Sequence, residues 1–209
     1  MRKFKKQLLI VIALVAFSFQ GFAQGAVEIT GFGGYTFKNT FAIYGGEATV
    51  GDGGTYGGSL AVEVRDGFDI EFYYSRQEST LSAFSVFDNV NFREPGNVSY
   101  WMLGGTRNFQ ALNPNMYFFT TLRLGGVTFS TKDNTPDNVT KFAASFGGGL
   151  KYFINDQMGI KLTGNMLFPI FDAGASLWFG SGGGGVGVST WSPILQFNFN
   201  GGVFFRIAR

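Results

Sequence analysis

The chain contains no cysteine and no histidine among its 209 residues. Without cysteine, no disulfide, thiolate metal site or cysteine nucleophile can be built. Without histidine, a Ser-His-Asp triad and a histidine metal site are excluded as well. We therefore expect no enzymatic activity, no metal and no cofactor.

Charged residues are also scarce, at 14% of the chain, and one short segment holds a quarter of the basic ones. The whole chain has 16 Lys and Arg against 14 Asp and Glu, for a net charge of +2. Residues 1–23 hold four basic residues and no acidic one, so the remainder has 12 against 14, or −2. No basic patch is left to bind nucleic acid, and we expect no nucleic-acid partner.

Only one long hydrophobic run is present, from Leu8 to Phe19. Basic residues precede this run, and Gly21 and Ala23 follow it, as in a secretory signal peptide. The run is shorter than the ~20 residues that a membrane-spanning helix needs, although a retained anchor helix is the alternative. We predict a signal peptide over residues 1–23, cleaved after Ala23, and a single domain over residues 24–209.

Phenylalanine and glycine are abundant in this predicted domain, and they alternate with polar residues. The clearest example is the stretch Phe142–Phe168, whose two halves each place apolar side chains on one face. Glycine, Ser145, Lys151, Lys161 and Asn165 lie on the other face, because side chains alternate across a strand. An apolar exterior around a narrow, polar and glycine-rich lumen is typical of a membrane β-barrel.

Similar segments recur along the chain, and they predict eight strands. We place these strands at about residues 26–38, 55–64, 68–77, 97–107, 116–129, 142–152, 158–168 and 194–207. The links between them alternate between long and short, which is the rhythm of a barrel with short periplasmic turns and long outer loops. The second link, Arg65-Asp66-Gly67, is a predicted three-residue hairpin loop with a left-handed glycine at its end. The predicted fold is all-β, an eight-stranded antiparallel up-and-down transmembrane β-barrel that follows a cleaved signal peptide.

The hairpin sequence GGGLKYFINDQMGIKL, the signal peptide and the aromatic last strand resemble those of small OmpA-like and opacity-type outer-membrane β-barrels. The resemblance extends over the whole predicted domain and implies residence in the bacterial outer membrane. It also implies outer-membrane lipid and the barrel-assembly machinery as partners. The chain ends Ile207-Ala208-Arg209, without the terminal aromatic residue that is common in this family.

Charged side chains on the inward face are predicted to gather near the short turns. Acidic residues lie on strands one to three and basic residues on strands four to eight, so that an acidic arc faces a basic one across the lumen. We expect a network of ion pairs that plugs the lumen, the alternative being independently solvated charges in a wet pore. The expected members are Glu28, Glu63, Asp69, Glu71, Arg107, Arg123, Lys151, Lys161 and Arg206.

Four aromatic residues are expected to point inward and to line the upper lumen, namely Phe32, Tyr73, Trp101 and Phe119. They could border an apolar passage or simply fill the bore. Two functional hypotheses follow. The protein is a structural or surface-display barrel whose external loops contact an extracellular partner, or it is a small porin or OmpW-like channel or carrier for small hydrophobic solutes.

Overall fold

The computed structural model describes residues 25–43, 46–85, 90–131, 138–170 and 195–207. The predicted signal peptide and most of the last long link, residues 169–193, lie outside these described residues. Among the residues that are described, no helix is long and apolar enough to cross a membrane.

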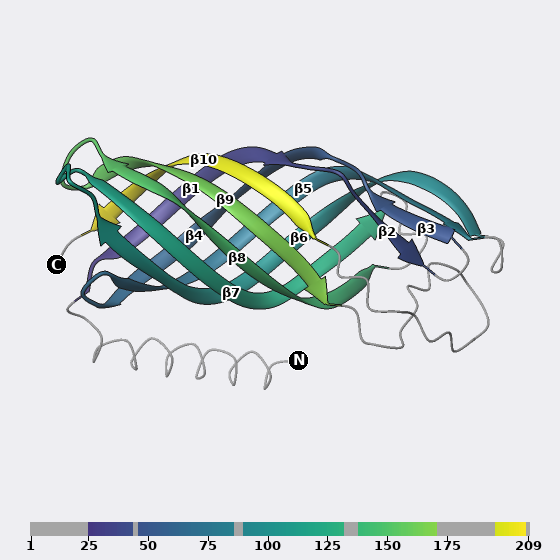
Figure 1. The fold of residues 1–209 in the computed structure, drawn as a ribbon, viewed down its shortest axis with the longest axis horizontal. Helices are drawn as coiled ribbons and strands as arrows, with labels where there is room; N and C mark the ends of the chain where they lie inside the picture. Colours follow the sequence, from purple (N-terminus) through teal and green to yellow (C-terminus); the bar gives the residue numbers. More distant parts are fainter. Residues whose placement is uncertain (1–24, 44–45, 86–89, 132–137, 171–194, 208–209) are drawn as a thin grey trace, which may run out of the picture.

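Eight antiparallel strands form a closed ring, which confirms the predicted fold class (Figure 1). Each strand pairs with its neighbour in the ring, and the β5–β6 pairing closes it. The ring consists of β1 (Val27–Thr36), β4 (Gly53–Arg65), β5 (Phe68–Ser85), β6 (Val90–Gln110), β7 (Met116–Thr131), β8 (Val139–Phe153), β9 (Met158–Ile170) and β10 (Gln196–Ile207).

Two further strands lie where the sequence predicted a loop over residues 39–54. β2 (Asn39–Ile43) pairs with β3 (Gly46–Val50), and β3 in turn pairs with the far end of β5. The loop predicted over residues 78–96 is also mostly strand, because β5 continues to Ser85 and β6 begins at Val90. These extensions were missed because a strand beyond the lipid needs no apolar exterior and loses the alternation that marks a membrane span.

The two ends of the barrel differ in their connections. One end, here called the short-turn end, carries the links at residues 66–67, 111–115 and 154–157. It also holds the start of β1 and the end of β10 (Figure 1). The opposite end, here called the long-link end, carries the β2–β3 hairpin and the extensions of β5 and β6.

The first short turn keeps inward and outward residues in phase. Gly67 has a φ of 67°, as predicted for the last residue of this loop. Arg65 still pairs with Phe68, so the link is tighter than the predicted three-residue loop, and Val64 is an extra residue in a bulge. Glu63 therefore lies directly opposite Asp69.

The exterior of the ring is apolar, and its interior is polar along most of its length. Burial alternates residue by residue along β10, where the phenylalanines at 197, 199 and 205 are exposed and Gln196, Asn198 and Asn200 are buried. Leu60, Phe72, Leu103, Leu122 and Leu162 extend the exposed apolar surface around the other strands. A water-soluble fold would bury these residues, so the exterior is suited to lipid.

Candidate functional site: an ionic cluster that fills the lumen

The centre of the lumen holds an ion pair between β5 and β7. Arg123 donates to Glu71 Oε2 from Nε at 2.9 Å and from Nη2 at 2.7 Å. Both side chains are only 1% exposed. Thr106 also donates to Glu71 Oε2, at 3.2 Å, and Lys161 donates to Glu71 Oε1 at 3.0 Å. Both oxygens of the Glu71 carboxylate are thus bound, as a buried charge requires.

Two lysines are held next to one another by a shared carboxylate. Lys151 of β8 lies directly opposite Lys161 of β9 in the strand register, an arrangement that is repulsive on its own. The Glu28 carboxylate lies 2.9 Å from Lys151 Nζ and 3.5 Å from Lys161 Nζ. Asp69 adds a second carboxylate at 3.6 Å from Lys151, so each lysine faces two anions.

The buried network is electrically balanced. Its six members, here called the ionic cluster, are three acids and three bases, so their formal charges sum to −3 + 3 = 0. They are Glu28, Asp69, Glu71, Arg123, Lys151 and Lys161, and all are buried. Six charges at this depth are tolerated because every one has an ion-pair partner.

A further ion pair lies at the short-turn end of the lumen. Arg206 Nη2 lies 2.6 Å from Glu63 Oε2, and the two side chains are 30% and 20% exposed. Arg206 is the register partner of Glu28 across β1 and β10, yet it pairs with Glu63. Asn108 donates to Asp69 at 2.8 Å, so a hydrogen bond supplements the ion pair of that carboxylate.

Aromatic rings pack against all three cations of the ionic cluster. The Arg123 guanidinium lies 4.5 Å from the centroid of the Tyr73 ring, which stacks on Phe32 at 5.2 Å. The Phe119 ring lies 5.0 Å from Lys161 Nζ and 5.7 Å from Lys151 Nζ. Phe32, Tyr73 and Phe119 point inward as predicted, but Phe119 lies beside the lysines of the ionic cluster and not in the predicted upper lumen.

Two predicted lumen residues face outward. Trp101 is 47% exposed, and its ring covers the outer face at Gly126, where an added Cβ would lie 2.3 Å from it. Arg107 is exposed at the short-turn end and donates to the backbone oxygen of Asp66 at 2.9 Å. The prediction was wrong because residues 100–103 are apolar on both faces of β6, so their pattern did not show which face points inward. Tyr73 pairs directly with Met102, so it is Met102 that points inward.

A belt of amide and hydroxyl side chains continues the polar network toward the long-link end, and sequence reasoning missed it. Arg123 donates to Asn165 at 3.1 Å, and Asn165 donates to Asn198 at 3.1 Å. Asn198 donates to Thr36 at 2.8 Å, and the hydroxyls of Thr36 and Thr55 lie 2.6 Å apart. The inward positions of Asn165 and Asn198 were visible in the alternation, but the contact between β9 and β10 depends on register.

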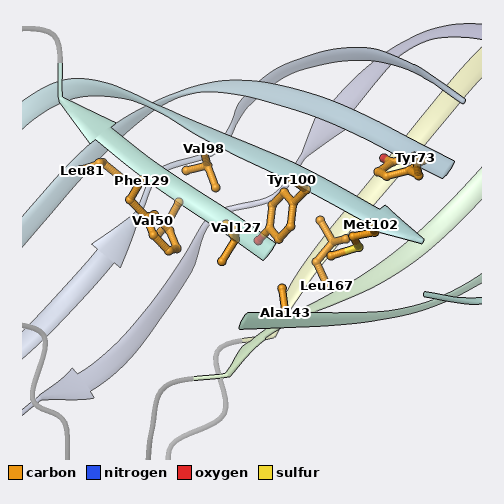
Figure 2. Close-up of a cluster of buried hydrophobic side chains, with 10 residues drawn as sticks. All are labelled: Val50, Tyr73, Leu81, Val98, Tyr100, Met102, Val127, Phe129, Ala143 and Leu167. Atoms are coloured by element: carbon orange, nitrogen blue, oxygen red, sulfur yellow. The ribbon is translucent and has the colours of Figure 1, made fainter. Parts of the chain in front are cut away.

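The lumen becomes apolar beyond this belt. Ten buried residues, here called the apolar cluster, pack together inside the wall near the long-link end (Figure 2). The Tyr100 hydroxyl among them donates to Gln196 at 2.8 Å. They are Val50, Tyr73, Leu81, Val98, Tyr100, Met102, Val127, Phe129, Ala143 and Leu167.

The protein is a closed eight-stranded antiparallel β-barrel with an exterior suited to lipid and a filled interior. Small outer-membrane proteins share this fold. No protein-family model matches the chain, and no curated protein matches it. Solved structures do match it. The outer membrane protein OprG from Pseudomonas aeruginosa is 9% identical, with a TM-score of 0.56 over 90% of this chain and 97% of that one.

Two other solved barrels give similar values. The N-terminal β-barrel domain of Pseudomonas aeruginosa OprF is 18% identical, with a TM-score of 0.52 over 88% of this chain and 100% of that one. Neisserial surface protein A is 12% identical, with a TM-score of 0.50 over 88% of this chain and 99% of that one. At these identities the similarity shows the shared fold.

Proposed function

We propose that the protein is an integral barrel of the bacterial outer membrane, with a structural or surface-display role and a lumen closed by the ionic cluster. The exposed apolar exterior supports insertion in lipid, since an aqueous surface of this composition would aggregate. The shared fold with the outer membrane protein OprG supports the location. Outer-membrane lipid and the barrel-assembly machinery are the partners that this role entails.

The observation that carries the proposal is the filling of the lumen at the ionic cluster. The cavity there has a volume of about 10 Å³ and is bordered by Glu71, Arg123 and Lys161. This volume holds about one water molecule, which is far too little for a continuous column of water. An ion entering this space would have to separate buried ion pairs, so the closed state is the stable one.

The long-link end would be the part of the protein that meets an extracellular partner. β5 continues to Ser85, past its last pair with β4 at Gln77, and there it pairs with β6 and with β3 of the β2–β3 hairpin. Regular hydrogen-bonded strands would hold this surface in a fixed shape. We propose no enzymatic role and no nucleic-acid partner.

Swelling of proteoliposomes tests the closed lumen. Vesicles with the refolded wild-type barrel should shrink in an osmotic gradient of a small sugar and stay shrunken, as protein-free vesicles do. Vesicles with a general porin serve as the positive control. Re-swelling of the wild-type vesicles at a rate close to that of the porin would contradict the proposal.

A second candidate function, a channel or carrier for small hydrophobic solutes, is favoured by one observation. The apolar cluster provides an interior apolar environment that a structural barrel does not require (Figure 2). Crystals grown with a short brominated alkane would test it, because bromine is located by its anomalous signal. A bromine site among Met102, Tyr100 and Leu167 would support the carrier, and bromine bound only to the outer wall would exclude it.

A further inference from the structure

A larger cavity, here called the mouth pocket, opens at the short-turn end of the lumen and has a volume of about 550 Å³. Side chains of β4, β7, β8 and β10 line it, together with the links at residues 111–115 and 154–157. Binding sites for small molecules have volumes of this order. The lining residues that bear on its chemistry are Glu63, Asn115, Tyr117, Phe153, Asp156 and Arg206.

The mouth pocket ends at a layer of aromatic rings, and no residue of the ionic cluster lines it. The centroid of the Phe153 ring lies 5.5 Å from that of Tyr117 and 4.9 Å from that of Phe204, and both contacts are edge to face. Phe204 is fully buried behind this layer, and its centroid lies 6.0 Å from Lys151 Nζ of the ionic cluster. The pocket is therefore a dead end, and a molecule can bind in it without passing through the barrel.

Arg206 has hydrogen-bond donors to spare in the mouth pocket. Its Nη2 donates to Glu63 Oε2, and within the described part of the chain no other side-chain hydrogen bond holds the guanidinium. A guanidinium has five N–H donors, so the edge turned away from Glu63 is available. The group lies 5.9 Å from the centroid of the Phe153 ring, beside the apolar wall of the pocket. An arginine in this position is suited to bind the carboxylate of a ligand.

Asp156 adds a negative charge at the rim of the same pocket. It is exposed, and its carboxylate has no ion-pair partner among the residues that the structure describes. The turn that carries it is ordered, since Asn155 Oδ1 accepts from the backbone nitrogens of Gln157 and Met158. The backbone oxygen of Gln157 accepts from the backbone nitrogen of Arg206 at 2.6 Å, which ties this turn to the end of β10. A carboxylate and a guanidinium are thus held on one rim.

We propose that the mouth pocket is a binding site for a small zwitterion, a molecule with an ammonium, a carboxylate and an apolar group, as in amino acids and short peptides. A ligand with only negative charge would be repelled by Glu63 and Asp156, and one with only positive charge by Arg206. The carboxylate of a zwitterion binds Arg206, its ammonium binds Asp156, and its apolar group packs against Phe153 and Tyr117. This site lies outside the closed lumen, so it adds a ligand to the proposed structural role and needs no transport.

Titration of the dipeptide alanyl-phenylalanine into the refolded barrel in lipid nanodiscs, followed by NMR, tests the site. Saturable changes are expected in the backbone amide signals of Asn115, Phe153 and Arg206, and none in that of Tyr100 in the apolar cluster. Two blocked forms of the dipeptide are the matched ligand controls, since N-acetylation removes the ammonium and C-terminal amidation removes the carboxylate charge. Each blocked form should bind about tenfold more weakly, because one charge-assisted hydrogen bond is lost.

The variants R206Q and D156N assign each charge of the ligand to its partner. In D156N the free and the acetylated dipeptide should bind equally, and in R206Q the free and the amidated dipeptide should bind equally. R107Q is the matched control, because Arg107 is exposed at the same end of the barrel and lies outside the mouth pocket. It should bind the free dipeptide as the wild type does.

Three results would overturn the proposal. They are the lack of a saturable change in the wild type, equal binding of the free and the blocked dipeptides to the wild type, and a loss of affinity in R107Q as large as in R206Q. Should R206Q fail to fold, the blocked dipeptides and D156N, whose substitution lies in an exposed turn, still decide.

Discussion

At the scale of single residues, Glu28 has a unique position in the lumen. It is the carboxylate that reaches both Lys151 and Lys161, which face each other across β8 and β9. Removing one partner from a buried ion-pair network leaves the other charge without compensation, which is more costly than losing an exposed pair. The stability of the cluster should therefore depend strongly on Glu28.

The E28Q variant is expected to destabilise the barrel by about 3–5 kcal/mol, because two buried lysines lose their shared anion. The matched control is E63Q, which breaks the partly exposed pair with Arg206 and should cost less, about 1 kcal/mol or below. Urea unfolding of both variants in lipid vesicles measures the difference. Equal losses of unfolding free energy would show that burial of the cluster does not govern its strength.

Charge reversal provides a second test at this scale. K151E alone, or D69K alone, should destabilise the barrel by about 3–5 kcal/mol. In the double variant K151E/D69K, the new acid lies opposite Lys161 and the new base lies opposite Glu63. Both repulsive register pairs of the wild type become attractive, so most of the stability should return.

K151E/E63K is the control for this swap. The lysine at position 63 would lie beside Arg206 and would not reach the site of Lys151, whose partners are Glu28 and Asp69. Urea unfolding should show recovery only for the pair with D69K. Rescue by E63K in place of D69K would contradict the observed pairing.

At the scale of the strands, most of the barrel could be predicted because its two faces differ in chemistry. β10 alternates phenylalanine with amides, and the short turns at 66–67 and 154–157 preserve the phase between strands. β6 could not be predicted in this way, since Tyr100 and Met102 inside are as apolar as Trp101 and Leu103 outside. The pairing of Met102 with Tyr73 shows which face of β6 points inward. The alternation within a single strand does not reveal which residues it pairs with.

The same limit applies to the candidate site. Alternation placed Glu28, Glu71, Arg123 and Lys161 on the inward face, but it could not show which acid meets which base. The amide belt and the choice of Glu63 for Arg206 depend on how far the strands are staggered around the ring. The β2–β3 hairpin was missed because each of its strands is only five residues long and no lipid-facing side marks it.

Depth along one strand gives a test of the apolar exterior. Leu124 and Thr128 point outward from β7, with Leu124 53% exposed within the apolar surface and Thr128 above it, hydrogen-bonded to Thr140. L124R should lower the unfolding free energy by about 2–4 kcal/mol and T128R by about 0–1 kcal/mol. Unfolding in lipid vesicles measures both, and a cost that does not change with depth would mean that this face does not meet lipid.

At the scale of the whole molecule, the two ends of the barrel are predicted to lie on opposite sides of the outer membrane. Single cysteines at Asp52 and Asn138 mark the long-link end, and those at Asp66 and Asn155 mark the short-turn end. All four positions are exposed, and the wild-type chain has no cysteine to interfere. An impermeant maleimide added to intact cells should label the first two alone.

Permeabilised cells provide the control for access, since all four cysteines should then react. Labelling of Asp66 and Asn155 positions on intact cells, with protection of the other two, would reverse the orientation of the barrel. If none of the four cysteines is labelled on intact cells, neither end of the barrel is exposed at the cell surface.

The central claim is that the balanced ionic cluster seals the lumen, and single-channel recording in a planar lipid bilayer tests it most directly. The wild-type barrel should show no steady conductance, because each charge of the ionic cluster is paired and the cavity beside the cluster has a volume of only about 10 Å³. E28Q should show opening events as the two lysines separate, and E63Q should remain closed. A wild-type barrel that conducts steadily, with E28Q indistinguishable from it, would contradict the claim.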